Sequence, residues 1–72
     1  MALGQPTIFP GKVLQIRALL TADGVTLFEA ARQRLKVLSG WRRDPSDSDT
    51  VEFLLLGEAA TKRHLKRQRG VN

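Results

Sequence analysis

The clearest pattern of apolar and polar positions lies in the middle of the chain, where it predicts an amphipathic helix from Thr26 to Ser39. The apolar side chains fall within about a third of the helical wheel, at Leu27, Phe28, Ala31, Leu35 and Leu38. Thr26 followed by Glu29 makes a capping-box pattern, and Gly40 is placed to end the helix in a left-handed turn. We expect this helix to pack the core.

The segment from Lys12 to Thr21 fits both regular periods. As a helix, it gathers one arc of apolar side chains, at Val13, Ile16, Leu19 and Leu20. As a strand, it turns polar Gln15 and Arg17 outward and an apolar face inward, at Leu14, Ile16, Ala18 and Leu20. We predict a helix, because the segment is rich in good helix formers and Asp23-Gly24 resembles a glycine-terminated helix end.

The last third begins with an apolar run and continues into a basic one. Val51 to Leu56 is apolar on both faces, Gly57 follows, and Glu58 to Arg69 favours a helix. A buried strand that ends at Gly57 fits this pattern. So does one helix from Thr50 to Arg69, which Asp49 and Glu52 would cap and which would tolerate Gly57 at a cost of about 1 kcal/mol. We predict the continuous helix.

The remaining segments predict irregular structure. Residues Met1 to Gly11 hold two of the three prolines and are expected to form an arm whose Ile8 and Phe9 fold back onto the core. Residues 42–49 are rich in Asp and Ser and are expected to form an exposed connector.

The predicted fold is therefore one small domain over residues 1–72, mostly α, with a bundle of three helices at Lys12–Thr21, Thr26–Ser39 and Thr50–Arg69. The alternative is α+β, with strands at Lys12–Leu20 and Val51–Leu56. At 72 residues and without cysteine, the chain has neither the size nor the disulfides that usually stabilise a domain, so a partner or a second copy is physically favourable.

The charge balance points to an anionic partner. Twelve Lys and Arg against seven Asp and Glu give a net charge of +5, and the pI is about 10.8. The densest basic stretch closes the chain, at Lys62, Arg63, Lys66, Arg67 and Arg69. On a helix these residues share a face that can neutralise phosphates of DNA or RNA, with Arg42 and Arg43 as a second patch. A solvated, dipole-stabilised helix C-terminus explains the same residues equally well.

We therefore expect a nucleic-acid-binding accessory or regulatory module. The alternative is a protein-binding adaptor or inhibitor, in which Phe53, Leu54, Leu55 and Leu56, together with Trp41, form the interface with a partner or a second copy. The basic C-terminal residues would then meet an acidic protein surface. Trp41 also fits a role in packing the end of the central helix. No targeting segment is visible and the apolar run Phe53–Leu56 is too short to span a bilayer, so a cytoplasmic location is expected.

One segment resembles a known family. Ala30-Ala31-Arg32, Leu35, Leu38 and Gly40, followed by Val51-Glu52-Phe53, resemble the helix-then-strand segment of the small phage head-tail joining proteins of the lambda W type. The resemblance covers about a third of the chain and lacks the tight hairpin turn between Gly40 and Val51. It implies a structural or assembly role of the phage type and assigns a role to no individual residue.

Enzyme activity is not expected. His64 lies among four cations, and no Ser, Cys or carboxylate stands in a sequence relation to it that suggests a catalytic pair. The acidic run from Asp44 to Asp49 lacks the glycine and the closing glutamate of a calcium loop, and the chain has no zinc-ligand pattern. The glycines stand alone rather than in a phosphate-binding loop. We expect no cofactor and no metal.

Overall fold

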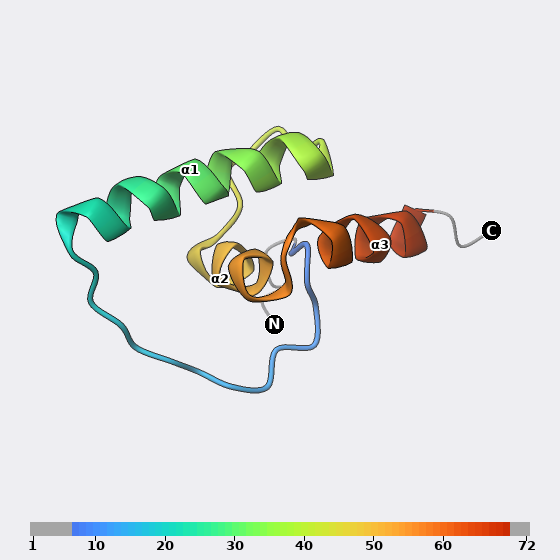
Figure 1. The fold of residues 1–72 in the computed structure, drawn as a ribbon. Coiled ribbons are helices and arrows are strands. Elements are labelled where there is room, and N and C mark those ends of the chain that lie inside the picture. Colours follow the sequence, from blue (N-terminus) through green and yellow to red (C-terminus); the bar gives the residue numbers. More distant parts are fainter. Residues whose placement is uncertain (1–6, 70–72) are drawn as a thin grey trace.

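The computed structural model describes residues 7–69 of the chain, and within them it contains three helices and no strand. They are α1 (Ala22–Ser39), α2 (Asp47–Leu56) and α3 (Glu58–Arg69). Figure 1 shows α1 lying across one side of α2, and α3 leading away from the end of α2. The prediction of a small, mostly helical bundle is confirmed, whereas the two strands of the α+β alternative are absent from this part of the chain.

Helix α1 contains the predicted amphipathic stretch and begins four residues earlier than expected. Its N-cap is Thr21, whose side-chain oxygen accepts a hydrogen bond of 3.1 Å from the backbone N–H of Gly24. Such a cap is worth about 1 kcal/mol. Thr26 is therefore an interior residue and not the cap that its spacing from Glu29 suggested. Gly40 ends α1 in the left-handed conformation, with φ 73°, as predicted.

The prediction of one continuous helix from Thr50 to Arg69 is wrong, because Gly57 divides it. Ser46 caps α2 by accepting from the N–H of Asp49 at 3.0 Å, and the N–H of Gly57 closes the helix on the carbonyl of Phe53 at 2.8 Å. Gly57 then takes φ 88° and ψ 166°, a conformation that is essentially restricted to glycine. Its own carbonyl accepts from Thr61 at 3.1 Å and starts α3.

The segment Lys12–Thr21, predicted as a helix, forms neither a helix nor a strand. We call residues 11–20 the extended segment, which Figure 1 shows sweeping away from the helices in blue and cyan before it enters α1. Every residue in it is exposed, Val13 and Leu19 almost completely, at 98% and 101%. No neighbouring element lies against it closely enough to bury the apolar arc that a helix would present, so the helical period alone does not stabilise a helix here.

The core is small and takes two residues from the N-terminal arm and one each from α1 and α2. Ile8 and Phe9 from the arm, Leu35 from α1 and Phe53 from α2 are buried. Around them pack the partly buried Ala31, Leu38, Trp41 and Leu65. The expectation that Ile8 and Phe9 fold back onto the core is confirmed.

The connector between α1 and α2 is shorter than expected. Of residues 42–49, Arg42 to Asp44 are exposed, whereas Pro45 is buried and Asp47 to Asp49 already belong to α2. Asp49 is itself buried, so the exposed connector does not extend to residue 49. Val51 to Phe53 are helical, which removes the strand that the phage-protein resemblance implied.

Candidate nucleic-acid interface

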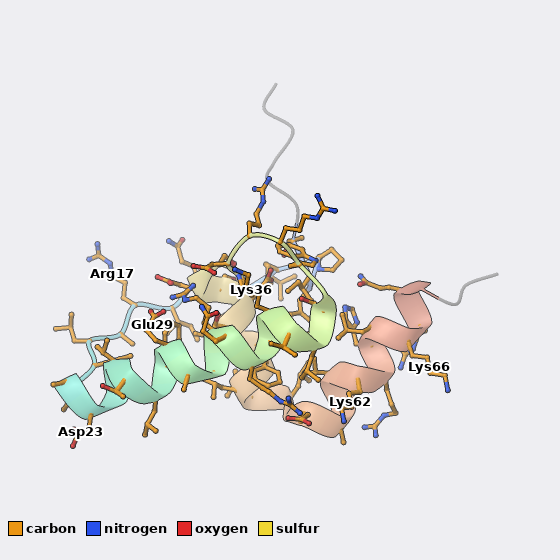
Figure 2. The ribbon with its side chains drawn as sticks, turned by 90° about the horizontal axis from the view of Figure 1, so that it is seen from above. Arg17, Asp23, Glu29, Lys36, Lys62 and Lys66 are labelled. Carbon is orange, nitrogen blue, oxygen red and sulfur yellow. The ribbon has the colours of Figure 1, made fainter. Side chains whose placement is uncertain are left out.

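Four of the predicted phosphate-binding residues stand exposed on α3, namely Lys62, Arg63, Lys66 and Arg67. Figure 2 shows the labelled side chains of Lys62 and Lys66 projecting from the same helix, one turn apart. The backbone of Arg69 continues α3, and its side chain lies outside the described part of the chain. The predicted basic face is therefore carried by an ordered helix over these four positions.

Most cations elsewhere in the fold are neutralised by the protein's own acids. Each such cation has a carboxylate oxygen within 4.0 Å of a side-chain nitrogen, usually at hydrogen-bonding distance. The pairs are Arg32 with Glu29 and Asp47, Arg34 with Glu58, Lys36 with Asp44, and Lys12 with Asp49. The basic residues of α1 are thus paired with acids of the same chain.

The α3 face is different. The Nζ of Lys62 lies 3.4 Å from the carboxylate of Glu58, which is one helical turn earlier in the chain. Arg63, Lys66 and Arg67 have no carboxylate within salt-bridge distance in residues 7–69. Arg42 and Arg43 are likewise exposed and unpaired within that range, and they form a second patch in the turn between α1 and α2. Within the described residues, the cations without a carboxylate partner therefore lie on these two elements and at Arg17.

Glu58 is the acid that joins the start of α3 to α1. Its carboxylate accepts two hydrogen bonds from the Arg34 guanidinium, at 2.9 and 2.7 Å. The Arg34 guanidinium, assisted by Lys62, lowers the pKa of Glu58 from 4.5 to about 2. Through its pair with Arg34, Glu58 joins the first turn of α3 to α1.

Asp49 ties the N-terminal arm to α2, a role that sequence reasoning missed. Its buried carboxylate accepts hydrogen bonds from the N–H groups of Ile8 at 2.8 Å and Phe9 at 3.3 Å, and from the Thr7 hydroxyl and Lys12 ammonium at 2.8 Å each. Burial raises the pKa of Asp49, but the bonds from Lys12, Ile8 and Thr7 together keep it below the ordinary value. Only its contacts distinguish this aspartate from its neighbour Asp47.

His64 has a structural partner on the same arm. Its Nε2 lies 2.8 Å from the carbonyl oxygen of Ile8, and because a carbonyl only accepts, Nε2 carries the proton. The imidazole also stacks on the Phe9 ring, with 4.8 Å between ring centroids. These contacts hold the arm against α3.

The predicted protein-interface residues separate into two groups. Phe53 is buried in the core and Trp41 packs against it, so neither offers its full side chain to a partner. Leu54, Leu55 and Leu56 are exposed. Leu55 and Leu56 line an open groove of about 770 Å³ that separates α2 from the extended segment, whose Leu14 and Ile16 form the opposite wall.

Comparisons with protein-family models, with curated proteins and with solved structures give no match to this chain. Over residues 7–69, no helix is both long and apolar enough to cross a bilayer. The same residues contain no cluster of three or more His, Asp or Glu side chains that could hold a metal ion.

Proposed function

We propose that this chain is a small nucleic-acid-binding module that contacts phosphates through α3 and acts by binding rather than by catalysis. The observation that carries the proposal is the division of the cations. Those of α1 are paired with acids of the same chain, whereas Arg63, Lys66 and Arg67 stand exposed without a carboxylate partner in the described residues. Such unopposed cations are available to a polyanion.

The expected mode of binding is electrostatic. Helix α3 has 12 residues and is about 18 Å long, and its exposed cations can lie along a phosphate backbone. Each neutralised phosphate releases counterions, so four contacts predict a slope of log K against log salt of about −3.6 on duplex DNA. Arg42 and Arg43 would add to this from the turn after α1. Phosphate contacts of this kind give affinity with little sequence preference.

The test is a salt titration of binding to duplex DNA and to single-stranded RNA, by fluorescence anisotropy. The double substitution Lys66→Ala/Arg67→Ala is expected to weaken binding to every sequence and to make the salt slope shallower by about 1.8. Both side chains are exposed, so the helical circular dichroism signal should not change.

Lys66→Ala alone has a matched control in Arg17→Ala, which removes the same charge. Arg17 is also exposed, and Figure 2 places it at the opposite end of the molecule from Lys66. Lys66→Ala should weaken binding several-fold more than Arg17→Ala does. If the two variants, or the double variant and the parent, bind equally at low salt, α3 is not the binding surface.

A second candidate function is a protein-binding adaptor, and the exposed apolar side chains favour it. Leu54, Leu55 and Leu56 on α2 and the apolar residues of the extended segment remain exposed, while in residues 7–69 only four apolar side chains form the buried core. An apolar surface of this extent typically marks a protein interface. Two results together would favour this candidate over the first. The protein would associate with itself or with another protein, and it would retard neither DNA nor RNA at low salt.

A further inference from the structure

The extended segment presents an unpaired backbone. Within the described residues, no N–H or C=O group of residues 11–20 takes part in a backbone hydrogen bond, and Lys12 holds the segment to Asp49 only through its side chain. Nothing covers the segment in Figure 1, where it passes freely beneath α2. An exposed extended backbone of this kind is a template for pairing with another strand.

The side chains of the segment alternate as those of a strand do. Leu14, Ile16 and Leu20 are 77%, 64% and 51% exposed, whereas Val13 and Leu19 on the opposite face are 98% and 101% exposed. Leu14 and Ile16 line the groove opposite α2, and so do Val13 and Gln15. The apolar side chains at even positions are thus less exposed than Val13 and Leu19, as in a strand that turns one face toward a neighbour.

We propose that the extended segments of two copies of this chain pair as an antiparallel two-stranded ribbon centred on Ile16. The sequence from residue 13 to residue 19 complements itself about this point, and Lys12 faces Leu20 at the end of the pairing. In that register Ile16 faces Ile16 of the second copy, Leu14 faces Ala18, Val13 faces Leu19, and Gln15 faces Arg17. A register centred on Arg17 would set two guanidinium groups against each other, and directly opposed like charges destabilise a strand pair.

The groove explains why such a ribbon would be stable. An isolated two-stranded ribbon is marginal in water and needs an apolar surface beneath it. Val51 and Leu55 of α2 line the groove of about 770 Å³ and supply that surface in each copy. The proposed dimer thus buries the apolar face of the extended segment and the outer face of α2 together. It does not use the cations of α3, so it holds or fails independently of nucleic-acid binding.

Single cysteines test the register, since the chain has none of its own. In the proposed ribbon the two copies of residue 16 lie directly opposite, with Cβ atoms about 4.5–5.5 Å apart, whereas the two copies of residue 17 lie on a diagonal, about 7–8 Å apart. A disulfide needs Cβ atoms about 3.5–4.5 Å apart, which a small shift of the first pair satisfies. Under mild oxidation at low micromolar concentration, Ile16→Cys should form disulfide dimers at least about tenfold faster than its matched control, Arg17→Cys.

Sedimentation of the reduced proteins supplies the second measurement. The parent should show a concentration-dependent monomer–dimer equilibrium, and Ile16→Glu should weaken dimerisation at least tenfold, because it opposes two carboxylates at the centre of an apolar face. Arg17→Glu, which faces Gln15, should weaken it much less. Residues 16 and 17 are exposed and outside the helices, so circular dichroism should report unchanged folding for both variants. A monomeric parent, or equal behaviour of the two positions in both assays, overturns the proposal, whatever the Lys66→Ala/Arg67→Ala experiment shows.

Discussion

Replacing Asp49 by Asn probes the contact that joins the N-terminal arm to the helices. The parent carboxylate accepts from Ile8 through Oδ2 and from Thr7, Phe9 and Lys12 through Oδ1. An amide has only one oxygen and cannot accept on both sides. Either the buried N–H of Ile8 or the donors on the other side must lose their acceptor, and the charge that faces Lys12 disappears as well.

The expected loss follows from these contacts. A hydrogen bond to a charged group contributes about 1.5–3 kcal/mol, and a buried donor left without a partner costs about 1–3 kcal/mol. Since one side of the amide can still accept, we expect Asp49→Asn to lower the free energy of unfolding by about 3 kcal/mol. A small domain has only about 5–15 kcal/mol in total, so this loss is large.

Urea unfolding followed by circular dichroism measures this change in the free energy of unfolding. Asp47→Asn is the matched control, because it makes the same chemical change two residues away on a side chain that is 84% exposed and paired with Arg32. Surface pairs of this kind contribute about 0–1 kcal/mol. A difference below about 0.5 kcal/mol between the two variants would refute the assigned role of Asp49.

A chain truncated to begin after Phe9 gives an independent check. It lacks the arm's donors from Ile8 and Phe9, and so Asp49→Asn should cost much less there than in the full chain. Equal costs in both backgrounds would mean that Asp49 stabilises the protein through something other than the arm.

Two further predictions concern the ends of α2 and α3. Gly57→Ala should destabilise the protein by about 1–3 kcal/mol, because φ 88° with ψ 166° strains any L residue although no atom lies within 4 Å of the added Cβ. If α2 and α3 were one continuous helix, Gly57→Ala would instead stabilise the protein by about 1 kcal/mol. Such a stabilisation in urea unfolding would contradict the division of the helix at Gly57. Glu58→Gln should flatten the pH dependence of the melting temperature. The folded-state pKa of Glu58 is lowered from 4.5 to about 2, so its contribution is present above pH 4.5 and is lost as the pH falls toward 2. An unchanged profile over that range would remove the role assigned to its pairing with Arg34.

The candidate interface was only partly visible in the sequence. The run from Lys62 to Arg69 shows its density of cations without any structure, and so does the pair Arg42-Arg43. The basic residues Arg32, Arg34 and Lys36 form a run that looks similar on the page. The structure brings acids to those three residues from α1 itself, from the connector, from α2 and from the start of α3. It leaves Arg63, Lys66 and Arg67 without a carboxylate partner in residues 7–69.

By itself, the sequence determined the helical class, the amphipathic face of α1 and the glycine that ends it, because helical period and left-handed turns are set by residues within a few positions of one another. The tertiary structure alone decided three other features. Asp49 binds an arm about 40 positions away in the sequence, which no local pattern encodes. The stretch from Thr50 to Arg69 fits one continuous helix or two helices divided at Gly57. In the tertiary structure it forms two, α2 and α3. The segment Lys12–Thr21 satisfies the period of a helix and of a strand alike, and it forms neither because no neighbouring element packs closely enough to bury its apolar side chains. Local energies differ too little to choose among such alternatives, so the choice falls to the contacts that the rest of the fold provides.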